Sequence, residues 1–256
     1  MLRETGARSI RIEDALARIM KQADSAPSQF APSWSGAFPR LCEIYLASDQ
    51  ASAGNWFQQP NVWQALISND QGLQPLERDL QVLDSKSWSI FLVKAAQRVH
   101  QMDKWGYSRA LFDCFNETKG YRFLVENGYE EVRVIPEQQS TQTPDLRARL
   151  GPSTVLMEVK TVNESDNQKD YFEIPGEQRP ALKAADRLSP SLQNKLASTV
   201  GVARTQLLAV KETTVTRRII YLIIRPDLHF EADDEFRLFL RAQSTPEIEI
   251  VHHFLG

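Results

Sequence analysis

The segment from Pro144 to Lys160 has the sequence PDLRARLGPSTVLMEVK, and its pattern is the most informative in the chain about the fold. Gly151-Pro152 suits a tight two-residue turn, because glycine accepts a positive φ and proline fixes the φ that follows. The flanking residues 145–150 and 153–162 are rich in apolar and β-branched side chains and are typical of strands. We therefore predict a β-hairpin here.

The turn also decides which hairpin residues are neighbours. Leu150 then faces Ser153, and counting outward places Asp145 directly across from Glu158. Opposed side chains have Cβ atoms about 4.5–5.5 Å apart. Two carboxylates at that separation repel each other unless one takes up a proton or a cation lies between them. A divalent cation with oxygen ligands would relieve the repulsion.

Strand periodicity adds a lysine to this pair. Glu158 and Lys160 are two residues apart and therefore face the same side of the strand. Leu156 and Val162 share that side, which predicts a strand buried on both faces. A buried carboxylate and a buried ammonium group need partners or a function. Together with a metal, two carboxylates and an ammonium group form a workable site for phosphodiester cleavage.

The segments around the hairpin predict an α/β fold. We expect a helix over about 107–127 that ends at Gly128, and then a strand near 130–136. Beyond the hairpin we expect a helix over 190–211, a strand over 217–225, a helix over 233–243 and a strand over 247–254. This order is typical of a central mixed β-sheet with helices on both faces.

The first hundred residues predict a helical extension. Four apolar residues have the spacing of one helix face: Ile12, Leu16, Ile19 and Met20. Another helix is expected around Trp88–Val99, and three more helices are expected to begin at prolines, namely Pro39, Pro60 and Pro75. We therefore divide the chain into a helical region, 1–100, and a second domain, 101–256.

The hairpin motif resembles a known signature. Pro144-Asp145, twelve intervening residues and then Glu158-Val159-Lys160 are similar to the PD-(D/E)xK motif of restriction-endonuclease-like nucleases. The order of elements over about 105–254 also resembles the core of that family. The resemblance implies a restriction-endonuclease-like core and a Mg²⁺- or Mn²⁺-dependent nuclease that hydrolyses phosphodiester bonds of DNA. It implies Asp145, Glu158 and Lys160 as catalytic residues, with Lys160 acting on the attacking water.

The same resemblance implies a set of metal ligands. Asp145 and Glu158 would hold the metal, helped by the carbonyl of Val159. Family members often add an acidic residue from the preceding helix, and Glu117 fits that place. Its rival is Glu126, at the frayed end of the helix, where a solvated charge is ordinary.

Positive charge is concentrated beside the hairpin. Residues 178–218 contain eight basic and two acidic side chains, a net +6, so the rest of the chain carries −9 and the whole chain −3. A basic stretch of this kind can bind the phosphate backbone of a nucleic acid, although a solvated helix face would explain the concentration of charge equally well. The candidate nucleic-acid contacts are Arg147, Arg149, Lys183, Arg187 and Lys195. The nuclease resemblance also implies a polar catalytic helper on the helix after the hairpin, and the choice stays open among Gln193, Lys195 and Gln206.

Several classes of protein are excluded or disfavoured. No apolar run is long enough to span a bilayer, and the N-terminus lacks an apolar secretory segment, so we expect a cytoplasmic protein without a membrane partner. Cys42 and Cys114 fit neither a disulfide framework nor a zinc site. A homodimer, or assembly with partner proteins of a larger nuclease system, is compatible with the resemblance. The alternative function is a non-catalytic nucleic-acid-binding or assembly module that keeps the nuclease fold.

Overall fold

The computed structural model describes residues 32–49, 54–102, 108–137, 143–162, 188, 190–212, 214–224 and 233–254. The chain divides into two compact units, Met1–Thr118 and Lys119–Gly256, and the boundary falls inside helix α6 (Arg109–Glu126). The domain boundary that the sequence suggests, after residue 100, lies upstream of this helix. The amphipathic pattern from Ile12 to Met20 lies outside the described residues.

The described part of the first unit is helical, as predicted. Its elements are α2 (Pro39–Ala47), the short 3₁₀ helix η2 (Trp56–Gln58), α3 (Pro60–Ile67), α4 (Gln74–Gln81) and α5 (Ser85–Arg98). The three prolines that the sequence predicts at helix starts each lie in the first turn of a helix, where a missing N–H costs no hydrogen bond. Aromatic rings fill much of the core, with Trp34 stacked on Phe57 at a centroid distance of 6.2 Å.

Helix α2 takes its N-terminal cap from another helix. Phe38, at the capping position, makes no side-chain cap hydrogen bond. Instead, the buried carboxylate of Glu77 in α4 accepts hydrogen bonds from the backbone N–H groups of Arg40, at 2.9 Å, and Leu41, at 3.1 Å. A negative charge at a helix N-terminus is favourable because the first amides have no partner within the helix. The cap therefore ties α2 to α4.

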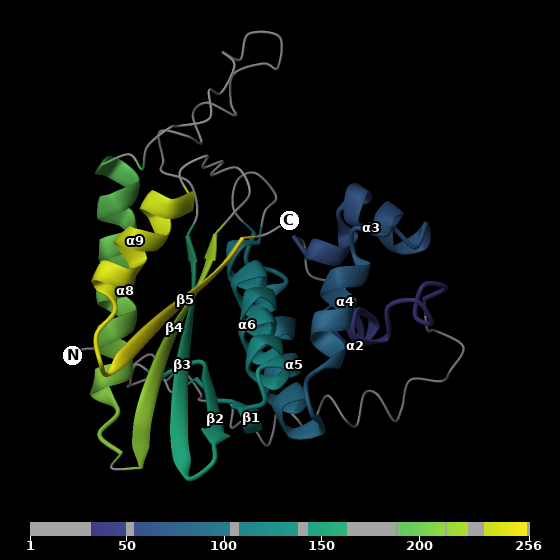
Figure 1. The fold of residues 1–256 in the computed structure, drawn as a ribbon. Coiled ribbons are helices and arrows are strands. Elements are labelled where there is room, and N and C mark those ends of the chain that lie inside the picture. The colour runs from purple at the N-terminus through teal and green to yellow at the C-terminus, as the bar shows by residue number, and fades with distance from the viewer. Residues whose placement is uncertain are drawn as a thin grey trace, which may run out of the picture. The chain divides into compact units, whose positions relative to one another are not determined.

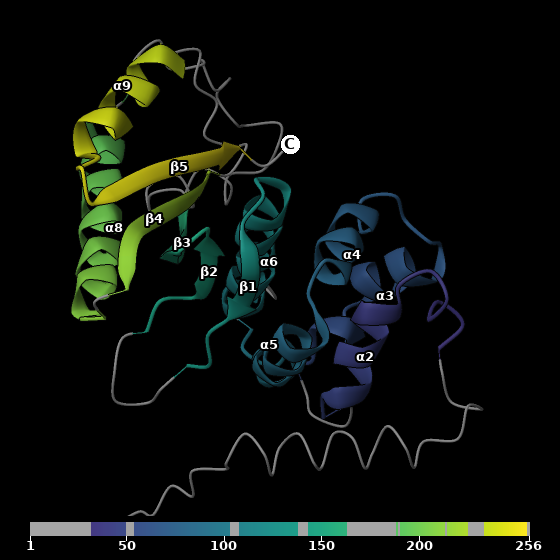
Figure 2. The ribbon, with the colours of Figure 1, turned by 60° about the horizontal axis from the view of Figure 1, so that its bottom comes forward.

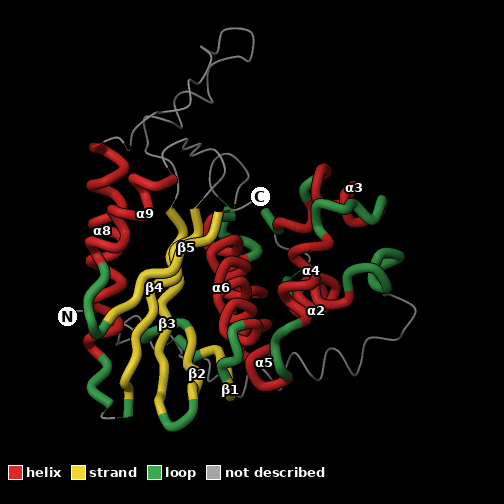
Figure 3. Tube along the Cα trace, in the orientation of Figure 1, coloured by secondary structure: helices red, strands yellow, loops and turns green. Residues whose placement is uncertain are grey.

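The second unit is an α/β fold built on one mixed sheet. Its strands are β1 (Glu130–Val134), β2 (Leu146–Leu150), β3 (Ser153–Val162), β4 (Val215–Ile224) and β5 (Ile248–Phe254), and they lie in that order across the sheet. The first three strands are antiparallel neighbours, whereas β3, β4 and β5 run parallel. Figure 1 labels these strands, and Figure 3 sets them apart from the helices by colour. The α/β class and the order of elements confirm the prediction.

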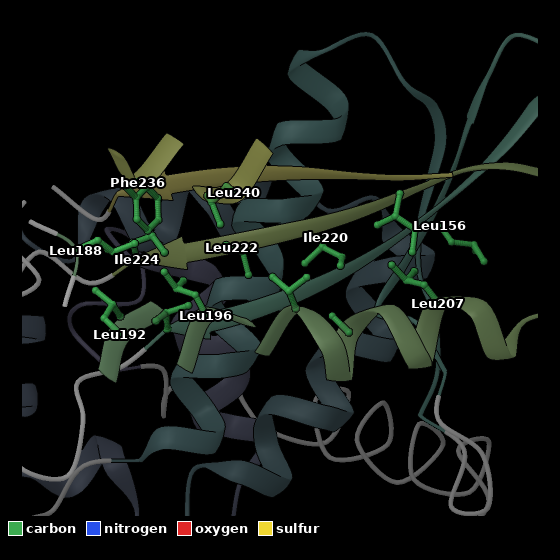
Figure 4. Close-up of a cluster of buried hydrophobic side chains, with 14 of the residues drawn as sticks. Leu156, Leu188, Leu192, Leu196, Leu207, Ile220, Leu222, Ile224, Phe236 and Leu240 are labelled. Atoms are coloured by element: carbon green, nitrogen blue, oxygen red, sulfur yellow. The ribbon is translucent and has the colours of Figure 1, made fainter. Parts of the chain in front are cut away.

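Helices α8 (Pro190–Ala209) and α9 (Asp233–Gln243) cover one face of the sheet, as Figure 2 shows. Helix α8 presents an apolar stripe at helical spacing: Leu192, Leu196, Val200, Ala203 and Leu207. This stripe packs with Phe236 of α9 and with sheet residues such as Leu156, Ile220 and Leu222 (Figure 4). The burial of this layer fixes which side chains of β3 face α8.

The part of α6 within the second unit packs on the opposite face. A Cβ atom at Gly120 would lie 2.7 Å from Cγ2 of Val159, 3.1 Å from Sδ of Met157 and 3.3 Å from Cδ1 of Leu146. Only glycine allows so close an approach between helix and sheet. Strand β3 is thus buried on both faces, as the sequence predicts.

Candidate active site

The hairpin has the predicted register. Gly151 has a φ of 58°, and the pairs run from Leu150 opposite Ser153 to Leu146 opposite Met157. Asp145 directly precedes β2, and its Oδ2 accepts a hydrogen bond of 2.8 Å from the backbone N–H of Val159. The turn therefore places Asp145 at the open end of the hairpin, beside the middle of β3.

Glu158 is a carboxylate inside an apolar layer. Its side chain is 1% exposed, and its register neighbour on β4 is the fully buried Ile220 of the α8 layer. Burial, and then the charge of Asp145, raise the pKa of Glu158 to about 7, while the charge and hydrogen bond of Lys160 and the backbone N–H of Asp145 act in the opposite direction. The carboxylate pair that the sequence predicts is thus brought together, and its two charges repel each other.

Lys160 lies at the solvent side of this pair. Its Nζ is 2.6 Å from Oε1 of Glu158, and its side chain is 27% exposed. The other oxygen of Glu158, Oε2, is buried and has no hydrogen-bond partner within the part of the chain that the structure describes. The buried side of the site therefore keeps an oxygen acceptor without a donor, which is unusual in a protein interior.

The carboxylates of Asp145 and Glu158 meet some of the requirements of a divalent-cation site. Carboxylate oxygens are the ligands that Mg²⁺ prefers, and the unpartnered Oε2 of Glu158 beside the charge of Asp145 is such a donor set. Within the described part of the chain, no three side chains of the His, Cys, Asp or Glu type come together as a metal group. Val159 donates its N–H to Asp145, and the role of its carbonyl as a ligand stays a prediction.

Glu117 has a partner that the sequence analysis missed. It lies on α6 within the first unit, and its two oxygens are 2.6 and 2.7 Å from Nζ of Lys94 in α5. The side chain of Glu117 is buried, and that of Lys94 is 10% exposed. Lys94 lies within a helix whose neighbouring positions are apolar, which is a signal that it needs a buried counter-ion. The rival, Glu126, is exposed and pairs with Arg122. A place for Glu117 in a metal shell stays a prediction.

The candidate nucleic-acid contacts lie in different surroundings. Arg147 forms a two-pronged ion pair with Glu212, at 2.8 and 2.6 Å, and Arg149 pairs with Glu131 at 3.0 Å. These pairs are well exposed, so exchanging a carboxylate for a phosphate would cost little. Lys195 is half-buried on α8. Lys183 and Arg187 lie outside the described residues.

Other members of the basic stretch stabilise the fold. Arg218 donates hydrogen bonds to the carbonyls of Leu207 and Val210 at the C-terminal end of α8. Arg204 donates to the carbonyl of Gln243, and Arg217 pairs with Glu249. These three arginines have internal partners, so the net charge of the stretch overstates what a ligand would meet.

The helper candidates on α8 also differ. Gln193 donates a hydrogen bond of 3.0 Å to the carbonyl of Leu188, whereas Oε1 of Gln206 is buried without a partner among the residues that the structure describes. The polar helper among Gln193, Lys195 and Gln206 stays a prediction.

A scan against protein-family models and searches of curated proteins and solved structures returned no match. The function proposed for this chain therefore rests on the geometry of the site itself. No helix within the described segments has both the length and the apolar character needed to cross a membrane.

Proposed function

We propose that the chain is a metal-dependent nuclease that hydrolyses phosphodiester bonds, with DNA as its substrate. One observation carries the proposal. The buried carboxylate of Glu158 has an unpartnered oxygen and lies beside the charge of Asp145, while Lys160 closes the solvent side. A site of this kind has charge to attract a cation and an ammonium group that can reach an anionic substrate.

Each residue has a distinct role in this proposal. Asp145 and Glu158 are the oxygen donors, and the Val159 N–H fixes the orientation of the Asp145 carboxylate. A bound Mg²⁺ would supply the positive charge that polarises the phosphodiester. Lys160 keeps its ammonium group at the partly exposed end, where it orients water and stabilises charge that develops on the phosphate.

A second candidate function is favoured by the same lysine. An ion pair of 2.6 Å is also what a structural counter-ion for a buried carboxylate would form. In that case the chain is a non-catalytic nucleic-acid-binding or assembly module. The two candidates differ in their response to metal, because only a true site gains stability from Mg²⁺ or Mn²⁺.

The test combines cleavage with metal response. Purified protein is incubated with linear, circular and single-stranded DNA and with RNA, in Mg²⁺ and in Mn²⁺. Asp145→Asn keeps an acceptor for the Val159 N–H but loses the charge, so it should fold normally and lose cleavage. Glu131→Gln, a change to an exposed carboxylate paired with Arg149, is the control and should cleave as the wild type does. Wild-type activity in Asp145→Asn would refute the metal site.

A further inference from the structure

Strand β5 ends in three consecutive ring-bearing residues, His252, His253 and Phe254. The parallel register places Lys160, Leu222 and His252 in one row across three strands. Phe254 lies two residues further toward the C-terminal end of β5, in register with Ile224. Residues in register on adjacent strands face the same side, so His252 and Phe254 share the face of Lys160. Within the described residues, β5 pairs with β4 alone, and it is an edge strand.

The rings on this face form a compact cluster, which we name the aromatic ledge: Phe236, His252 and Phe254. The buried Phe236 of α9 lies 5.4 Å from the ring of His252 and 5.6 Å from that of Phe254. The rings of His252 and Phe254 are 5.5 Å apart and nearly perpendicular, at 85°. Phe254 is 37% exposed. An exposed ring is thus held in place by a buried one.

The ledge is close to the proposed catalytic residues. Adjacent strands lie about 4.8 Å apart, and β4 lies between β3 and β5. The backbone positions of Lys160 and His252 are therefore about 10 Å apart across the sheet. A few nucleotides of single strand can bridge such a distance.

We propose that the aromatic ledge binds an unpaired nucleobase of the strand that is cut, by stacking on Phe254. Bases stack on Phe and His rings in single-stranded recognition, and every base has a face for such stacking. A base inside a duplex is already stacked on its neighbours, so the ledge favours single-stranded or frayed substrates. Phe254 is the most exposed ring of the ledge and His252 is half-buried, so the exposed area is far smaller than the roughly 1,200 Å² that a stable protein interface buries. This inference names the substrate class of the proposed nuclease and rests on that function.

The test measures binding without cleavage, using Ca²⁺ in place of Mg²⁺. The probe is a single-stranded oligonucleotide that carries 2-aminopurine, whose fluorescence falls when it stacks, and the comparison is the same sequence as a duplex. Phe254→Leu keeps an apolar side chain but removes the ring. It should weaken single-strand binding about tenfold and abolish the quenching, with duplex binding unchanged. Phe254→Trp should retain both.

The control is Leu238→Ala, which alters an exposed apolar side chain of α9 outside the ledge and should bind as the wild type does. The inference is overturned if the wild type does not bind single strands, if Phe254→Leu binds them normally, or if both substrates weaken equally. Failure of the nuclease gives a different pattern. If the wild type never cleaves but shows Phe254-dependent binding, base stacking on the ledge is supported and the proposed nuclease activity is refuted. If duplex and single strands are cleaved equally by wild type and Phe254→Leu, catalysis stands and the ledge is wrong.

Discussion

Glu158 is the residue on which the chemistry of this molecule depends. A carboxylate loses hydration when it is buried, and one short ion pair with Lys160 offsets only part of that cost. Its second oxygen, Oε2, is buried and has no hydrogen-bond partner among the described residues, and the register neighbour of Glu158 on β4 is Ile220 of the apolar α8 layer. Such a residue is kept ionised by a cation or becomes protonated near neutral pH.

The raised pKa of Glu158 predicts a specific dependence of stability on pH. Its pKa rises from the ordinary value of 4.5 to about 7 on folding, so between these values the folded state holds a proton that the unfolded state has lost. The free energy of unfolding should therefore fall as pH rises through this window, by on the order of 3 kcal/mol, and then level off. Urea titrations from pH 4.5 to 8 would measure this, with Glu158→Gln as the control that lacks the slope.

Mg²⁺ should act in the opposite sense over the same window. Metal binds the ionised carboxylates, so its stabilising effect should grow as pH rises toward 7. A Mg²⁺ effect that is the same at pH 5 and pH 8 would contradict the assignment of Glu158 as a ligand.

Lys160 separates catalysis from binding. Lys160→Met keeps the aliphatic stem and removes the ammonium group, so the carboxylates and their metal should remain. Single-turnover cleavage should slow by about two orders of magnitude or more, while DNA affinity in Ca²⁺ is roughly retained, because the lost group acts on charge that develops in the transition state. The matched control is Lys86→Met, which removes an exposed lysine of α5. Cleavage at the wild-type rate in Lys160→Met would favour the non-catalytic module.

Some residue-level features follow from sequence and others do not. The approach of Asp145 to Glu158 was predictable, because a two-residue turn fixes every pair of the hairpin. The bond from the Val159 N–H to Asp145 was not, because it needs the side-chain conformation at the end of β2. The partnership of Lys94 with Glu117 joins two helices, and no local periodicity determines such a pair.

Helices and strands could be predicted from sequence wherever a single period of apolar residues dominates. Strand β4 is apolar and β-branched along most of its length, and the stripe on α8 follows the helical period. The bulge in β1 was missed, where the register shifts between Glu130 and Arg133 and Glu131 has a φ of 50°. A charged, alternating edge strand carries no sequence signal for an extra residue.

Two mid-helix glycines offer a matched test of packing at the scale of elements. A Cβ atom at Gly201 of α8 would have no heavy atom of another element within 4 Å, whereas a Cβ at Gly120 of α6 would meet Val159 at 2.7 Å. Gly201→Ala should raise the free energy of unfolding by up to about 1 kcal/mol, since alanine favours the helix. Gly120→Ala should be less stable than Gly201→Ala by about 1–3 kcal/mol because of overpacking. Equal gains in thermal unfolding experiments would show that α6 does not pack closely on β3.

At the scale of the whole molecule, the two units share one helix. The sequence suggested a boundary after residue 100 because the nuclease resemblance covers about residues 105–254 and does not extend over the first hundred residues. The structure places the division within α6, so the first unit includes Glu117 together with its counter-ion Lys94. A boundary drawn from composition could not detect this, because a buried ion pair leaves no mark on average polarity.

Removing Lys94 should therefore unsettle the first unit. Lys94→Met leaves the buried carboxylate of Glu117 without its counter-ion and should lower the free energy of unfolding by about 3–5 kcal/mol. The double variant Lys94→Met/Glu117→Gln should recover much of this loss. Unchanged stability in Lys94→Met would rule out a structural role for the pair.

The cap that Glu77 provides for α2 has a consequence for the order in which this chain opens and closes. A helix of nine residues is marginal alone, and α2 has no capping side chain of its own. Its first amides are protected only while α4 is folded, so the two helices should unfold locally as one cooperative unit. The hydrogen exchange of the Arg40 and Leu41 amides would then report the opening of a helix that lies more than thirty residues further along the chain.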